Sequence, residues 1–127
     1  MVGGILITHG PMAQALIKAA ETIVGKVKHI YGFSTTDLSI DTIVERIERI
    51  SAEDDWPRKT LVMVSLKGGS CWNAALTAKM KLNNIEVVSG VNLSMLLSFA
   101  TKRNSNTLDS LADIVVSDGK TGIDKHK

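Results

Sequence analysis

The stretch Gly3-Gly4-Ile5-Leu6-Ile7-Thr8-His9-Gly10-Pro11 joins a short apolar run to a histidine and a turn signal. An apolar run of this length that stops at Gly-Pro is typical of a buried strand, and we expect the strand to end near Thr8. Pro11 suits the first turn of a helix, because its φ is already fixed and its missing N–H would have no partner there. His9 is therefore predicted to lie in a β-to-α turn.

A helix is predicted to follow this turn. Apolar residues recur at offsets of 3, 4, 7, 8 and 11 from Met12, which places them on one helical face. The predicted apolar stripe consists of Met12, Ala15, Leu16, Ala19, Ala20 and Ile23.

The same alternation of strand and helix continues along the chain. Further apolar runs at 29–33, 61–64 and 86–91 are separated by helical patterns. Parallel neighbours in a sheet need a crossover connection, and that crossover is usually a helix. The sequence therefore predicts an α/β fold, with a single doubly wound domain over 1–127 and a mainly parallel sheet of four strands.

The end of the chain is predicted to hold a fifth helix. Asn106 is the expected N-cap, and Asp118-Gly119 is the expected end of the helix. The polar residues 120–127 fit either a frayed tail or a short edge strand.

Composition narrows the function classes. The 127 residues are 44% hydrophobic, enough for one core, and the net charge of +2 comes from scattered lysines and arginines. This pattern disfavours nucleic acid and membrane as direct partners and favours a small molecule or a protein. A single cysteine, no signal-peptide pattern and no apolar run of membrane-spanning length predict a cytoplasmic protein.

Two loops are expected at the carboxyl edge of the sheet, where α/β proteins bind ligands. The first is Thr8-His9-Gly10, and the second is Ser65-Leu66-Lys67-Gly68-Gly69-Ser70. Paired glycines let a ligand approach the backbone, and the N–H groups that begin a helix favour an anion. Gly10, Gly68, Gly69 and Ser70 are thus candidate phosphate-binding residues, although Gly-Gly-Ser also occurs simply as a tight turn with a serine N-cap.

His9 is the candidate catalytic residue. An imidazole that faces backbone amides can accept a phosphoryl group on nitrogen, whereas an isolated strand-end histidine would only bond a neighbouring carbonyl. A Ser70–His9 hydrolase is disfavoured because the chain has no Gly-x-Ser-x-Gly elbow. The three histidines and Cys71 show no metal-ligand spacing, so we expect neither a metal nor another cofactor.

Three motifs resemble the mannose-type enzyme IIA domains of the bacterial phosphotransferase system. They are Gly4-Ile5-Leu6-Ile7-Thr8-His9-Gly10, Gly68-Gly69-Ser70-Cys71-Trp72-Asn73-Ala74-Ala75 and Val88-Ser89-Gly90-Val91-Asn92-Leu93-Ser94-Met95-Leu96. The resemblance implies that His9 takes a phosphoryl group from the phosphocarrier HPr and passes it to a IIB component, which serves a sugar permease at the membrane. It also implies a homodimer in which a last strand, about Lys120 to Lys125, is exchanged and pairs antiparallel with the partner's sheet.

The chain departs from the family pattern at two positions. Ser65 stands where the family usually has aspartate, and Cys71 where it usually has proline. A carboxylate beside the imidazole would fix its tautomer, whereas a serine offers only a neutral hydroxyl. Asp37 is a candidate substitute for the missing acid. Cys71 is expected to pack as a small buried side chain. Its predicted place in the first turn of a helix could also lower the pKa of its thiol.

Two further residues and two functional hypotheses remain open. Lys67 either assists an incoming phosphate or is a solvated loop charge, and Thr8 is a candidate because it adjoins His9. The first hypothesis is a phosphohistidine carrier of sugar uptake. The second is a regulatory interaction module of the same fold with weak or no phosphotransfer. This hypothesis follows from the presence of Ser65 where the family usually has aspartate.

Overall fold

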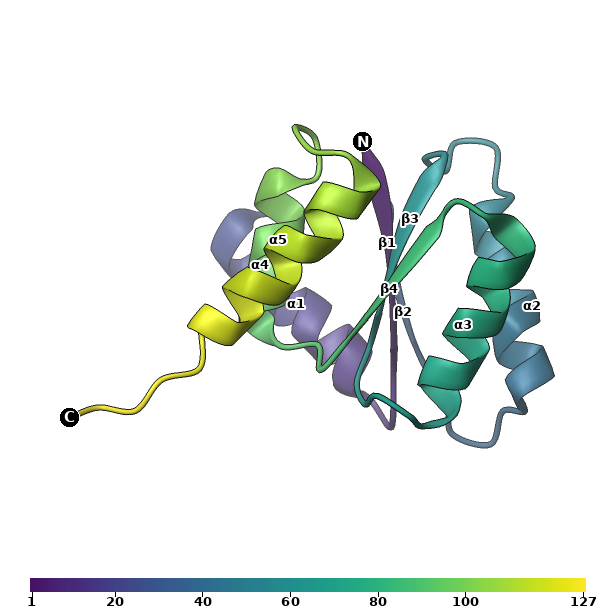
Figure 1. Cartoon of the computed structure of the whole chain (residues 1–127), viewed down its shortest axis with the longest axis horizontal. Helices are drawn as coiled ribbons and strands as arrows, with labels where there is room; N and C mark the ends of the chain where they lie inside the picture. Colours follow the sequence, from purple (N-terminus) through teal and green to yellow (C-terminus); the bar gives the residue numbers. More distant parts are fainter.

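A four-stranded parallel sheet separates two layers of helices in the computed structural model, which describes residues 1–127 (Figure 1). The strands are β1 (Val2–Thr8), β2 (Ile30–Ser34), β3 (Lys59–Val64) and β4 (Ile85–Ser89), in the order β2-β1-β3-β4. The helices are α1 (Met12–Val24), α2 (Ile40–Ser51), α3 (Ser70–Leu82), α4 (Leu93–Lys102) and α5 (Leu108–Thr121). This single α/β domain with four parallel strands confirms the predicted fold class.

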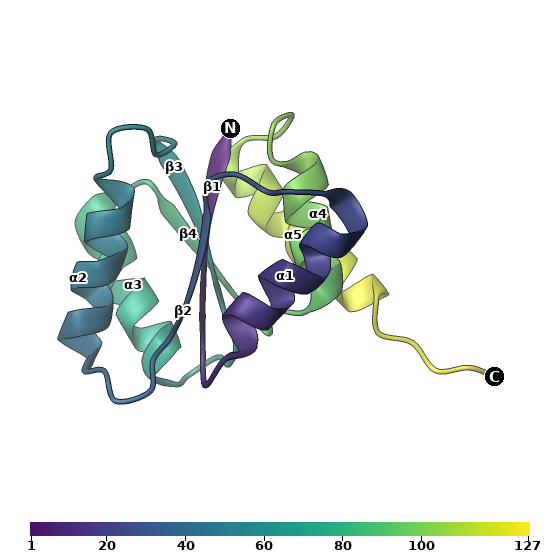
Figure 2. The same cartoon turned by 180° about the vertical axis from the view of Figure 1, so that it is seen from behind.

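The two helical layers bury two separate cores. Figures 1 and 2 show α1, α4 and α5 on one face of the sheet and α2 and α3 on the other. Successive residues of β1 point to opposite faces, so Leu6 packs toward the three-helix layer while Ile5 and Ile7 pack toward the two-helix layer. Every residue of β1 is buried, because neighbouring strands and both layers enclose it.

The strand order places a switch point beside β1. From β1 the chain moves to β2 on one side, then returns to add β3 on the other side. The loops that leave the carboxyl ends of β1 and β3 therefore diverge toward opposite faces of the sheet, and the crevice between them is the usual ligand site of such folds. The loop that carries His9 and the loop that begins at Ser65 are these two loops.

The buried face of α1 differs from the predicted stripe. The residues that α1 turns inward are Ala13, Leu16, Ile17 and Ala20, whereas Met12, Ala15 and Ile23 are exposed. A Cβ added at Gly32 on β2 would lie 2.8 Å from Ile17 Cδ1 and 3.0 Å from Ala13 Cβ. The glycine thus lets α1 approach β2 closely with this face. The predicted stripe was right for Leu16 and Ala20 and wrong for Met12, Ala15 and Ile23.

The last helix also differs from its predicted bounds. Thr107 is its N-cap and accepts a hydrogen bond from the Ser110 N–H at 3.2 Å, whereas Asn106 donates to the Lys102 carbonyl at the end of α4. The helix extends to Thr121, so Lys120 and Thr121 are helical rather than part of a strand.

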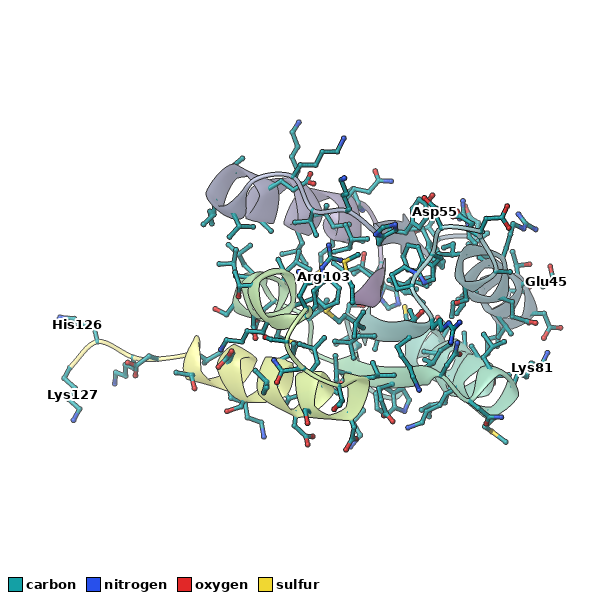
Figure 3. The ribbon with its side chains drawn as sticks, turned by 90° about the horizontal axis from the view of Figure 1, so that it is seen from above. Glu45, Asp55, Lys81, Arg103, His126 and Lys127 are labelled. Atoms are coloured by element: carbon teal, nitrogen blue, oxygen red, sulfur yellow. The ribbon has the colours of Figure 1, made fainter.

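Residues 123–127 form no strand within this chain and lead away from the body. Figure 3 shows His126 and Lys127 well outside the helical layers. No helix is both long enough and apolar enough to cross a membrane.

Candidate active site

His9 and Ser65 meet at the switch point. The strands β1 and β3 pair with Ile7 opposite Val64, so their following loops start side by side. His9 Nδ1 lies 3.1 Å from Ser65 Oγ, while His9 Nε2 makes no hydrogen bond. The structure therefore places the predicted histidine against the residue that replaces the family's aspartate, with its second ring nitrogen free.

A cavity of about 350 Å³ adjoins this pair. Its lining residues are His9, Met12, Ser65 and Leu66. Met12 and Leu66 are 40% and 60% exposed, respectively, so apolar side chains flank the imidazole at the surface. Sequence reasoning missed both, because Met12 fitted the predicted core stripe and Leu66 stood among polar loop residues.

The second loop opens α3 without a side-chain cap. Gly69 is the N-cap, and Ser70 is the first helical residue. Gly68 has a φ of +87°, and no atom lies within 4 Å of a Cβ added at Gly68 or at Gly69. The first N–H groups of α3 thus lack an intrahelical or side-chain partner, and they carry the positive end of the helix dipole. This arrangement does not match the alternative in which the serine is the N-cap.

Gly10 and Thr8 shape the turn around His9. Gly10 has a φ of +59°, the left-handed region that glycine adopts most easily. The Thr8 side chain is buried, and its Oγ1 accepts a hydrogen bond of 2.8 Å from the Ala13 N–H. Pro11, the N-cap of α1, makes no side-chain cap hydrogen bond, so Thr8 supplies the missing one. The geometry gives Thr8 a capping role rather than a contact with the cavity.

Two other candidates do not join the pair. Asp37 is exposed, has a φ of +62°, and makes neither a hydrogen bond nor an ion pair with His9. In this geometry Asp37 does not replace the family's aspartate. Lys67 is exposed and forms no ion pair. Nowhere do three or more His, Cys, Asp or Glu side chains gather so that they could hold a metal ion.

Cys71 lies inside the protein behind the second loop. It is fully buried in the first turn of α3, and it packs in the core shared with α2. Its thiol lies 3.6 Å from the Thr35 hydroxyl, a contact between residues 36 positions apart in the chain. The buried environment agrees with the packing role expected for Cys71, and the contact to Thr35 was not foreseen.

Comparison with known proteins decides the family. The sequence pattern of EIIA-man, described as PTS system fructose IIA component, matches residues 3–116. The chain belongs to this family. The match covers both loops of the candidate site and confirms the resemblance found in the sequence motifs.

Members of this EIIA family from several bacteria are similar to the chain. It is 29% identical over 118 residues to the PTS system mannose-specific EIIAB component of Escherichia coli (strain K12), covering 91% of this chain and 36% of that protein. The chain thus spans about a third of that relative's length. It is 27% identical to the sorbose-specific EIIA component of Klebsiella pneumoniae, covering 87% of this chain and 82% of that protein.

A solved structure supports the same relationship. The phosphotransferase system component EIIA from Streptococcus agalactiae superimposes with a TM-score of 0.90 at 25% identity, covering 98% of this chain and 97% of that one. The EIIA fold of the chain is therefore established from both sequence and structure.

Proposed function

We propose that the protein is a phosphocarrier of a sugar phosphotransferase system, in which His9 accepts a phosphoryl group from phospho-HPr and passes it to a IIB component. The observation that carries the proposal is the pairing of His9 Nδ1 with Ser65 at 3.1 Å, which leaves Nε2 free. A hydrogen bond at one ring nitrogen orients the imidazole, so the other nitrogen can act as the nucleophile. Membership of the EIIA family supports the choice of donor and acceptor.

The proposed transfer is a nucleophilic substitution at phosphorus. His9 Nε2 attacks, an N–P bond forms, and the bond from phosphorus to the donor breaks as the donor leaves with the bonding electron pair. The N–H groups that begin α3 can then hold the phosphoryl oxygens, with Gly68, Gly69 and Ser70 forming the cradle. The IIB component attacks the same phosphorus in the second step and restores free His9.

Ser65 sets the limit on this reaction. A carboxylate accepts hydrogen bonds only, so it would hold the ring proton on Nδ1 and the lone pair on Nε2. The Ser65 hydroxyl can either accept from Nδ1 or donate to it, so it does not select one tautomer. Charged hydrogen bonds are stronger than neutral ones by about 1–1.4 kcal/mol, and we expect transfer about five- to tenfold slower than with an aspartate.

The same substitution motivates a second candidate function. A regulatory interaction module of this fold could keep His9 and the cradle yet transfer phosphoryl groups slowly or not at all. Genes for IIB and membrane permease components beside this one would argue against it. A neighbouring gene for a transcription factor or a kinase would favour it.

We also propose a homodimer with exchange of the C-terminal segment. The strand β4 stands at one end of the sheet order, so one of its edges has no strand partner in this chain. An unpaired edge is a template for another strand, and residues 123–127 extend away from the body with Ile123 75% exposed. Since α5 continues to Thr121, the exchanged strand would be shorter than the 120–125 expected from sequence.

The proposed partners also define the place of action. HPr and a IIB component would meet the carrier in the cytoplasm, with any association with the membrane made through the permease complex.

Incubation with phosphoenolpyruvate, enzyme I and HPr tests the proposed phosphocarrier function, because an acid-labile phosphoryl group should appear on His9. Failure to label, where a sibling IIA protein is labelled, would reject it.

A further inference from the structure

The residue before His9 is held by Thr35, which sequence analysis did not single out. Thr35 follows β2 and is 7% exposed. Its backbone N–H donates to the Thr8 carbonyl at 3.0 Å, and its hydroxyl Oγ1 lies 3.4 Å from the same oxygen. The carbonyl immediately before His9 therefore receives two donors from one buried residue.

The Thr35 hydroxyl also connects to the start of α3. Cys71, the second residue of α3, is fully buried, and its Sγ donates to Thr35 Oγ1 at 3.6 Å. Sulfur is a weak donor and makes longer contacts than oxygen. The thiol donates a hydrogen bond to the hydroxyl oxygen of Thr35. The hydrogen of that hydroxyl is therefore free to point at the Thr8 carbonyl. A line of contacts thus runs from the candidate phosphate cradle to the His9 loop.

The end of β1 is held from both sides. On the side of β3, the Ser65 N–H donates to the Ile7 carbonyl at 3.2 Å, and on the side of β2, Thr35 holds the Thr8 carbonyl. His9 follows these two anchored carbonyls directly. The backbone position of His9 relative to Ser65 depends on both anchors, and Thr35 also contacts Cys71 of α3.

We infer that Thr35 is a positioning residue for His9, which acts with the Cys71 thiol to hold the His9 loop in register with the start of α3. This inference rests on the proposed phosphoryl transfer. Thr35 is buried and outside the cavity lining, so it contacts neither the donor protein nor the phosphoryl group. Small displacements of a reacting group can slow a reaction strongly, so loss of this anchor is expected to affect transfer rather than docking.

The test compares three variants in the full chain. Thr35→Val removes the hydroxyl and keeps the branched shape, whereas Thr35→Ser keeps the hydroxyl. Thr60→Val is the matched control, because Thr60 is also buried but accepts from Trp56 Nε1 at 3.0 Å, where β3 begins rather than at the site. Each variant is assayed for the single-turnover rate of phosphorylation by phospho-HPr and for its melting temperature.

The expected result is a separation of rate from stability. Thr35→Val should transfer about 3- to 10-fold more slowly at an unchanged half-saturating concentration of phospho-HPr, and Thr35→Ser should recover most of the rate. Thr60→Val should melt at a lower temperature and transfer at the wild-type rate. A wild-type rate in Thr35→Val, or a Thr35→Ser rate no better than that of Thr35→Val, would overturn the inference.

Two further measurements keep the result decisive. If wild type accepts no phosphoryl group, the proposed function fails, and the ¹⁵N shifts of the His9 ring then decide the positioning role. They should move in Thr35→Val and stay in place in Thr60→Val, and unmoved shifts in both would reject it. If Thr35→Val does not fold, Cys71→Ala should slow transfer and Cys71→Ser should restore it, whereas equal rates would reject the role.

Discussion

The chemistry of the site depends on the two atoms that meet at the carboxyl ends of β1 and β3. His9 Nδ1 and Ser65 Oγ lie 3.1 Å apart, and neither atom carries a formal charge when the imidazole is neutral. This neutral pair can orient the ring, but it stabilises positive charge on the ring less than a carboxylate would. The identity of residue 65 should therefore affect how fast His9 transfers a phosphoryl group, rather than whether His9 can transfer it.

Substitution at position 65 tests this control. Ser65→Asp should raise the rate of phosphorylation by phospho-HPr about five- to tenfold, because a charged acceptor fixes the Nδ1–H tautomer and stabilises the ring as charge develops. Ser65→Ala is the matched control and should be slower than wild type, since Nδ1 then loses its partner. Equal rates in all three proteins would show that residue 65 does not tune His9.

At the scale of elements, close helix contacts determine which residues are buried. Alternating strands and helices were predictable because each apolar run is short and each helical pattern keeps its period. The buried face of α1 was not predictable from its own residues, because the space at Gly32 on β2 selects Ala13 and Ile17. The contact between Cys71 and Thr35 could not be read from the sequence either, since only the fold brings the residue after β2 against the first turn of α3.

Filling the space at Gly32 should separate α1 from β2. Gly32→Ala adds a Cβ only 2.8 Å from Ile17 Cδ1, and we expect a loss of about 1–3 kcal/mol in the free energy of unfolding. Adding Ile17→Val deletes Cδ1 and should restore part of that loss. Urea denaturation measures both effects, and an unchanged midpoint in Gly32→Ala would contradict the close packing described here.

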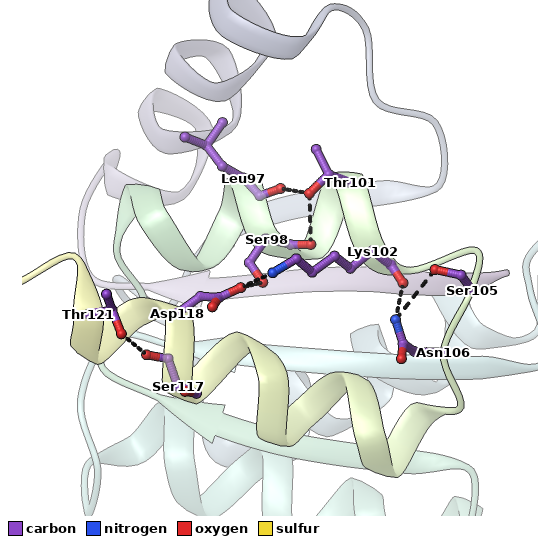
Figure 4. Close-up of polar contacts among 9 residues, drawn as sticks. All are labelled: Leu97, Ser98, Thr101, Lys102, Ser105, Asn106, Ser117, Asp118 and Thr121. Atoms are coloured by element: carbon purple, nitrogen blue, oxygen red, sulfur yellow. Dashed lines mark hydrogen bonds and ion pairs between the residues drawn. The ribbon is translucent and has the colours of Figure 1, made fainter.

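A polar cluster links α4 to α5 and gives a pH dependence to stability. Asp118 accepts hydrogen bonds from Lys102 Nζ at 2.6 Å and from Ser98 Oγ at 2.7 Å (Figure 4). The hydrogen bond from Lys102, followed by that from Ser98, lowers the pKa of Asp118 below its ordinary value of 3.8. A lowered folded-state pKa stabilises the protein above the ordinary value, and this contribution is lost as the pH falls through the lowered pKa.

Removing the Asp118 charge should therefore matter most near neutral pH. Asp118→Asn should lower the free energy of unfolding at neutral pH, and its difference from wild type should narrow as the pH falls below about 4. Asp113→Asn is the control, because Asp113 is exposed and forms no ion pair. Urea denaturation across this pH range measures the difference, and a gap that stays constant with pH would contradict the role of the Asp118 carboxylate.

At the scale of the whole molecule, the sheet leaves β4 as an edge and the chain leaves its last residues outside the body. In the proposed homodimer, a second copy covers this edge. The sequence motifs identified the family and the positions of His9 and Ser65. They did not predict that α5 continues to Thr121, which leaves a shorter segment for exchange than the expected 120–125. The packing of the rest of α5 is complete without that segment, since Leu111, Ala112, Val115 and Gly119 are buried within one chain.

Truncation of the tail tests the proposed dimer. A chain that ends at Gly122 should remain folded and sediment as a monomer, whereas the full chain should sediment as a dimer. Circular dichroism checks that the truncated protein keeps its helices. A dimer that survives truncation would reject strand exchange, and a monomeric full chain would reject the dimer itself.

The central claim is that His9 carries the phosphoryl group. The most direct measurement is the mass and acid lability of the protein after incubation with phosphoenolpyruvate, enzyme I and HPr, beside His9→Ala and a sibling IIA protein. We predict one acid-labile phosphoryl group on wild type and none on His9→Ala. An unlabelled wild type beside a labelled sibling, or a label that persists in His9→Ala, would contradict the account.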